Sequence, residues 1–107
     1  MQDEDQARKR FMIETEQAIR LANNEVIHQR IPKLTRDQVV AFAITVARVR
    51  ARYLEAAFKI SEKHNGETLG DSEIISLERQ RKAFEEARAA FEALTHAIER
   101  GYVDIES

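Results

Sequence analysis

The residues that interrupt helices are few in this chain, and their positions leave three long uninterrupted segments. The only proline is Pro32, and the only glycines are Gly66, Gly70 and Gly101. Each segment between these breaks has roughly 28–30 residues, and at about 1.5 Å per residue it would form a helix of about 42–45 Å. The spacing of the breaks therefore predicts three long helices, joined by linkers of only about four to seven residues.

The second segment has a clear beginning and a clear end. Thr35 stands where an N-cap is needed, and Gln38 follows three residues later, as in a capping box. At the other end, Gly66 can adopt the left-handed conformation that closes a helix, and Asn65 tolerates the same conformation. We therefore expect the second helix to begin after Thr35 and to end before Gly66.

The boundaries of the first and third segments are marked less clearly than those of the second. The third is expected to begin at Asp71 or Ser72, either of which can cap it, and to end at Gly101. The first has no distinct start between residues 2 and 7, and it is expected to end near Ile31, because the residue before a proline avoids the helical region. After Gly101, Tyr102 is expected to fold back onto the last turn of the third helix, and the rest of the tail is expected to fray.

Apolar residues form one stripe on the first and third segments but a much wider arc on the second. At about 100° per residue, the arc of the second segment covers more than half of its circumference, which is typical of a helix with several neighbours. Short linkers favour antiparallel neighbours. We therefore expect an all-α fold, an antiparallel up-down-up three-helix bundle forming a single helical domain over 1–107, with the second helix the most buried.

Three arginines lie within the second segment, and they do not share one face. Arg48 and Arg52 project to the charged, solvated side, whereas Arg50 projects into the apolar arc. A guanidinium cannot lose its charge, so its burial without a partner would be costly. The aliphatic part of the Arg50 side chain can lie on apolar surface while its guanidinium stays in water. Alternatively, the guanidinium can meet an acidic side chain of a second chain. It can also pair inside the bundle with one of the acids near its level, Glu14, Glu16 and Glu86.

The residue inventory argues against most kinds of catalysis. The chain has no cysteine, which excludes disulfides, thiolate zinc sites and cysteine nucleophiles. Its serines lie in no nucleophile elbow, and the segment "NGETLGD" lacks the lysine and the preceding strand of a phosphate-binding loop. We therefore expect no enzymatic activity and no cofactor.

Two histidine-containing pairs keep two further classes of function open. Glu25 and His28 have the Glu-x-x-His spacing of carboxylate-bridged metal bundles, and His96 with Glu99 has the reverse order. One chain holds no second copy of the motif, so a metal-binding, ferritin-like bundle would need dimerisation. An exposed histidine on a helix is also what a phosphotransfer protein requires, and His28 and His96 both meet that condition.

Charge and hydropathy argue against nucleic acid and membrane as partners. Residues 33–63 carry seven basic and three acidic side chains, but residues 64–107 carry five basic and ten acidic ones. These acidic neighbours can neutralise the basic segment, whereas a nucleic-acid binder usually has a strongly basic face. No apolar run approaches 18 residues, and the N-terminus lacks the apolar centre of a signal peptide. A cytoplasmic protein is the expectation.

Surplus apolar surface on the second segment predicts contact with another protein. We expect a non-enzymatic helical interaction module that acts through apolar helix faces, with a protein partner or a second copy of itself, most simply as a homodimer. Arg50 would set the register of this contact. The side chains expected to make the contact are Phe42, Val49, Tyr53 and Ile60.

Overall fold

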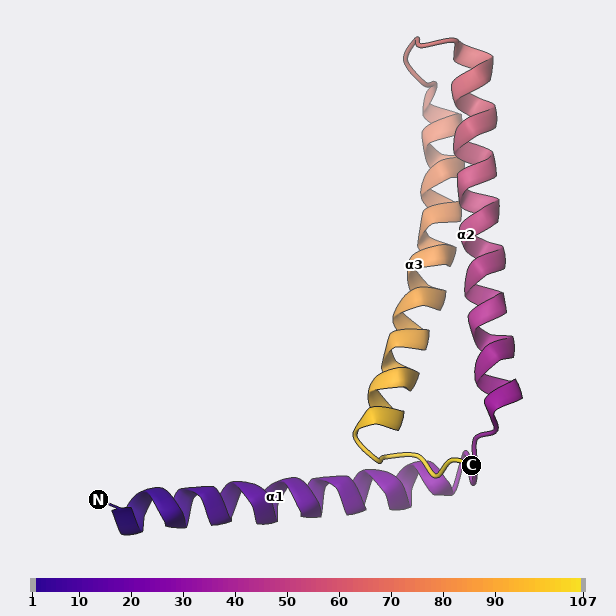
Figure 1. Cartoon of the computed structure of the whole chain (residues 1–107). Coiled ribbons are helices and arrows are strands. Elements are labelled where there is room, and N and C mark those ends of the chain that lie inside the picture. Colours follow the sequence, from indigo (N-terminus) through magenta and orange to yellow (C-terminus); the bar gives the residue numbers. More distant parts are fainter. Residues whose placement is uncertain (1, 107) are drawn as a thin grey trace. The chain divides into compact units, whose positions relative to one another are not determined.

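The computed structural model describes residues 2–106, and in this range the chain is built from three long helices. They are α1 (Gln2–His28), α2 (Arg36–His64) and α3 (Asp71–Glu99) (Figure 1). The described residues contain no strand, and their one β-type contact outside helices is an isolated parallel bridge between Leu34 and Ile105. The prediction of an all-α fold with three long helices is confirmed.

Contacts divide the chain into two compact units. The hairpin unit is Asp37–Leu94, and the terminal unit joins the chain up to Arg36 to the chain from Thr95 onward. The hairpin unit contains nearly all of α2 and α3. The terminal unit contains α1, the α1–α2 linker, the last turn of α3 and the C-terminal tail.

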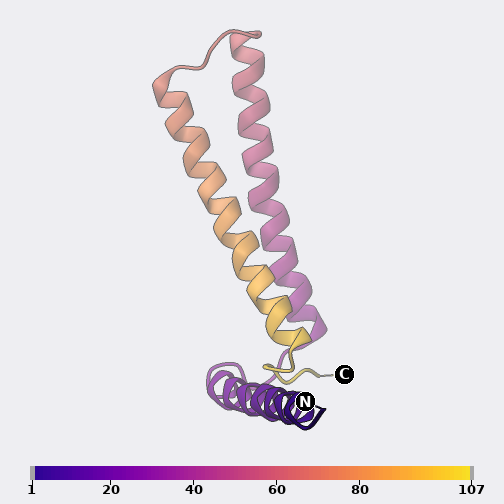
Figure 2. The ribbon, with the colours of Figure 1, turned by 90° about the vertical axis from the view of Figure 1, so that its left-hand side faces the viewer.

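The helices of the hairpin unit, α2 and α3, lie side by side and run in opposite directions (Figures 1 and 2). Two aromatic pairs join them. The ring centres of Phe42 and Phe91 are 5.6 Å apart, and those of Tyr53 and Phe84 are 6.3 Å apart. The short linker therefore produces the antiparallel pairing that its length predicts for these two helices.

The helix ends of the hairpin follow the capping signals closely. Thr35 directly precedes α2, and Asn65 and Gly66 have φ values of 49° and 89°, the left-handed conformation that stops a helix. α3 begins at Asp71, and the Glu73 side chain accepts a hydrogen bond of 3.2 Å from the Gly70 N–H. This bond satisfies a donor that the first turn of a helix leaves open.

The terminal unit is held together by the C-terminal tail. The Leu34 N–H donates to the Asp104 carbonyl at 2.9 Å, and the Glu106 N–H donates to the Leu34 carbonyl at 2.8 Å. Leu34 and Val103 are buried beside these bonds. The expectation that the tail frays is therefore wrong, because the linker, nearly 70 residues earlier in the chain, offers it backbone partners.

The end of α3 directs the chain into this tail. Gly101 has a φ of 74°, and the Tyr102 N–H donates to the Ala97 carbonyl at 2.8 Å. The Gly101 N–H donates to the Ile98 carbonyl at 3.1 Å, which completes a Schellman motif. At the other end of the unit, α1 stops at His28, three residues before the predicted Ile31.

Full burial is rare among the described residues. Only Leu34, Val46 and Val103 are buried apolar side chains, and Val46 is the only buried residue of α2. The prediction that the second helix is the most buried is therefore not confirmed. None of the three described helices has the length and apolar character needed to cross a membrane.

Candidate functional site

The side of α2 that faces α3 carries a regular apolar row, which we call the inner seam. Its spacing alternates between four and three residues, the repeat of a helix packed against another helix. Val46 is buried, and the other members are half-buried. The inner seam comprises Phe42, Val46, Val49, Tyr53, Ala56 and Ile60.

The matching row on α3 has the same alternating spacing. Every member is half-buried, including the polar Gln80. Two of its rings meet the inner seam, since Phe84 lies on Tyr53 and Phe91 lies on Phe42. The row comprises Leu77, Gln80, Phe84, Ala87, Phe91, Leu94 and Ile98.

Four of the residues predicted to contact a partner therefore lie within the hairpin. Phe42, Val49, Tyr53 and Ile60 all belong to the inner seam, where they are half-buried beside α3. The sequence pattern of α2 alone shows a wide apolar arc but not which side of that arc α3 covers. A role for these four side chains in partner contact stays a prediction.

A second apolar row on α2, which we call the outer seam, is exposed along its whole length. It lies about 160° around the helix from the inner seam, at about 100° per residue. The large side chains of Ile44, Leu54 and Phe58 are 48%, 50% and 68% exposed. The outer seam comprises Val40, Ile44, Ala47, Ala51, Leu54 and Phe58.

The spacing of the outer seam distinguishes it within the wide apolar arc of α2. Positions 40 to 58 of the outer seam alternate in steps of four and three residues, as the inner seam does two residues further on. Two such rows on one helix indicate two packing neighbours. α3 accounts for one of them.

Arg50 lies beside the outer seam as an exposed side chain. Its guanidinium carbon is 5.2 Å from the centre of the Phe84 ring, and that of Arg88 is 5.9 Å from the same centre. The guanidinium of Arg50 thus lies near an aromatic ring while the side chain as a whole is exposed, which favours the first of the three arrangements considered for it. Arg48 and Arg52 are also exposed.

α1 carries a row with the same kind of spacing, which we call the α1 seam, and all of its members except the half-buried Thr15 are exposed. Met12, Ile19 and Val26 are 51%, 47% and 61% exposed. The side of α1 that meets the tail is a different one, where Asn24 donates to Asp104 at 3.0 Å and His28 lies 3.3 Å from the same carboxylate. The α1 seam comprises Met12, Thr15, Ile19, Ala22 and Val26.

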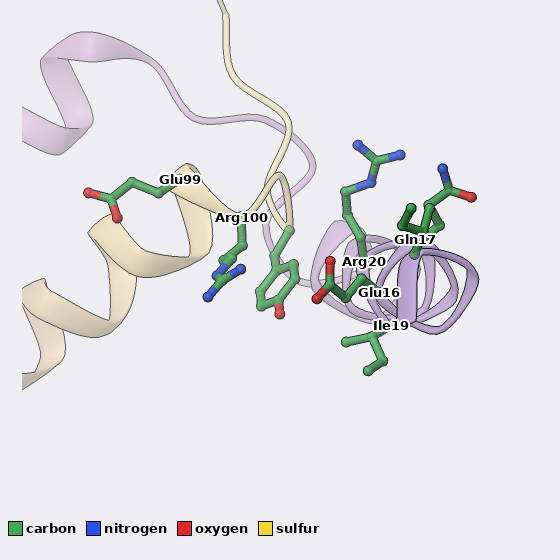
Figure 3. A pocket seen from close by; sticks show the side chains of 8 residues that line it. Glu16, Gln17, Ile19, Arg20, Glu99 and Arg100 are labelled. Carbon is green, nitrogen blue, oxygen red and sulfur yellow. The ribbon is translucent and has the colours of Figure 1, made fainter. Parts of the chain in front are cut away.

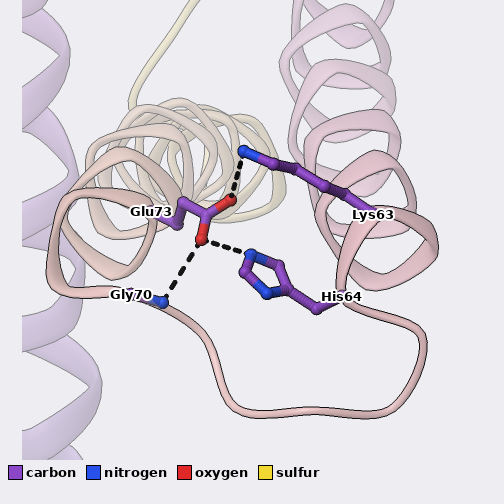
Figure 4. A network of polar contacts seen from close by, with 4 residues as sticks. All are labelled: Lys63, His64, Gly70 and Glu73. Carbon is purple, nitrogen blue, oxygen red and sulfur yellow. Dashed lines mark hydrogen bonds and ion pairs between the residues drawn. The ribbon is translucent and has the colours of Figure 1, made fainter.

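A polar cluster closes the open end of the hairpin, at the α2–α3 loop (Figure 4). Glu73 receives hydrogen bonds from His64 and from the Gly70 N–H, and its second oxygen is 3.5 Å from the Lys63 ammonium. Partial burial alone would raise the pKa of Glu73, but these bonds and the charges of His64 and Lys63 outweigh it and hold that pKa below its ordinary value. The cluster ties the two helix ends together.

Each histidine considered for metal binding has a neighbour other than the glutamate of its own motif. His28 pairs with Asp104 rather than with Glu25, and His96 packs its ring edge-on to Tyr102. Within residues 2–106, no three potential metal ligands come together.

An open groove of about 580 Å³ lies in the terminal unit, between α1 and the chain after α3 (Figure 3). Glu16 and Arg20 line it from α1, and Glu99, Arg100 and Tyr102 line it from the other side. Two acids and two bases give the groove no preferred ligand charge, so it selects no evident class of small molecule.

Comparison with known proteins adds no relative from which a function could be transferred. The chain matches no protein-family model, no curated protein and no solved structure. The exposed apolar rows on α1 and α2 are therefore the features from which a function has to be argued.

Proposed function

We propose that this protein is a non-enzymatic helical interaction module that self-associates, most simply as a homodimer, through apolar helix faces. The observation that supports the proposal is the exposed outer seam of α2, a regular apolar row on the side that α3 leaves free. Such a row left in water is what a partner helix covers in helix-in-groove and coiled-coil recognition. A cytoplasmic location stays a prediction.

The alternatives, a metal-binding bundle completed by dimerisation and a histidine phosphotransfer protein, have no observation of this kind in their favour. The pairing of His28 with Asp104 and the ring contact of His96 with Tyr102 give both histidines structural roles in the terminal unit. A contact function requires only the apolar rows.

The mass in solution tests the proposal directly. The chain is 12.4 kDa, so light scattering coupled to size-exclusion chromatography should give about twice that mass at micromolar concentration. The Ile44→Glu variant places a charge on the outer seam and should return the mass to that of one chain, with its helical circular dichroism retained. Ile75→Glu is the matched control, because Ile75 is also exposed but lies on α3, away from the seam. A single-chain mass for the unchanged protein at all concentrations would overturn the proposal.

A further inference from the structure

The outer seam of α2 and the α1 seam are complementary in the spacing of their apolar residues and in the charges beside them. We propose that α1 of one copy packs antiparallel on the outer seam of α2 in a second copy, and that the second copy reciprocates. This inference rests on the proposed self-association and specifies which faces meet. Each dimer would then contain two three-helix bundles, each completed by a helix from the other chain.

The two seams match in spacing and in side-chain size. Both alternate in steps of three and four residues, so antiparallel helices can keep them in contact over their length. With Ile19 opposite Ala47, every position of the α1 seam meets a position of the outer seam, and in two of the five layers, Ile19–Ala47 and Ala22–Ile44, a large side chain faces a small one. The other layers are Met12–Leu54, Thr15–Ala51 and Val26–Val40.

Charges beside the seams favour the antiparallel direction. In that alignment Glu16 lies on the same flank as Arg48 and Lys9 on the same flank as Glu55, each pair within one helical turn, at the flanking positions where coiled-coil charges pair. A parallel alignment covers the same number of apolar positions but brings Glu25 beside Glu62. Charge therefore selects the antiparallel alignment.

Charges also argue against the outer seam pairing with itself. Two copies of α2 that matched all six apolar positions in antiparallel fashion would place Arg48 against Arg48 and Arg50 against Arg50. Like charges at both flanks oppose this arrangement. In the α1–α2 alignment the acid on the flank of Arg48 is Glu16 of α1.

The terminal unit leaves the α1 seam available for such a contact. Asn24 and His28 hold the Asp104 side chain on one side of α1, and the side chain of Arg20 lies against Gly101. Met12, Ala22 and Val26 project from another side and are exposed. A twofold dimer uses each seam of each chain once, so the assembly closes without leaving a seam for further copies.

Cysteine crosslinking tests this pairing cleanly, because the chain has no cysteine of its own. One copy would carry Ile19→Cys with a short tag, and a second copy would carry Ala47→Cys with a different tag. The two are co-expressed, purified through both tags and mildly oxidised. We expect a disulfide between the differently tagged chains, seen on non-reducing gels and mapped by mass spectrometry. The matched control replaces Ala47→Cys with Thr45→Cys, which lies at a similar height on α2 but away from the outer seam.

The outcomes separate this inference from the proposed function. A dimer with an efficient 19–47 crosslink, and little 19–45 crosslink, supports both. A dimer in which 19–47 crosslinks no better than 19–45 overturns the pairing but keeps self-association. A single chain carrying both Ile19→Cys and Ala47→Cys that closes an internal disulfide, with a one-chain mass before oxidation, overturns both.

Discussion

Removal of the Leu54 side chain should weaken the dimer while leaving each hairpin intact. Leu54 is 50% exposed in the single chain, and in the proposed pairing Met12 of the second copy covers it. Full burial of a leucine side chain contributes about 1.5–3 kcal/mol, so covering the exposed half contributes about 0.8–1.5 kcal/mol. The dimer contains two such layers. Because alanine keeps the β-carbon, Leu54→Ala should cost about 1–3 kcal/mol of association free energy, a rise in Kd of about 5- to 150-fold.

Sedimentation equilibrium over a dilution series measures this Kd directly. Ile75→Ala is the matched control, since Ile75 is 58% exposed and lies on α3 outside every proposed contact, and its Kd should stay within about twofold of the unchanged protein. Helical circular dichroism should be the same for both variants. If Leu54→Ala and Ile75→Ala change the Kd equally, the outer seam is not the dimer contact and the reasoning from exposed area is refuted.

Three further changes test the charged groups. Acid should weaken the loop cluster, because the pKa of Glu73 is lower in the folded than in the unfolded protein. The contribution of Glu73 to the free energy of unfolding is therefore complete above the unfolded pKa of 4.5 and disappears as the pH falls through the folded pKa. In urea melts from about pH 6 to about pH 3, the unchanged protein should lose more stability than Glu73→Gln. Arg50→Leu should change the unfolding free energy by less than about 1 kcal/mol, the worth of an exposed cation–π contact, and a loss of about 3 kcal/mol in urea melts would show a buried ion pair instead. Glu16→Arg should raise the Kd of the dimer by about 2- to 30-fold, and adding Arg48→Glu should restore it, whereas an additive loss in the double-mutant cycle would contradict their pairing.

Much of the fold followed from local signals along the chain. Thr35, Asn65, Gly66 and Gly101 mark helix boundaries because capping depends on backbone conformation and hydrogen bonds within a few residues. Such signals act over short distances, so one sequence is enough to read them. The C-terminal end of α1 was expected near Ile31 but lies three residues earlier, at His28, because the chain continues in turns before Pro32.

The contact between His64 and Glu73 in the loop cluster does not follow from signals within either helix. Glu73 lies in the first turn of α3 and His64 in the last turn of α2, and each position alone indicates only a favourable charge at a helix end. Their contact depends on how the six-residue loop brings the two ends together, which neither helix specifies alone. The pKa shift of Glu73 is likewise a property of the pair.

By itself, the sequence determined that the chain forms three long helices and that the middle one is apolar on more than one side. These are consequences of capping chemistry and of the 3.6-residue turn, both of which act within one helix. Only the tertiary structure decided which side of α2 meets α3, that Phe42 and Tyr53 face inward, and that Asp104 and Glu106 of the tail bond to Leu34. Those outcomes depend on residues far apart in the chain, whose meeting is set by competition among several possible packings rather than by any local preference.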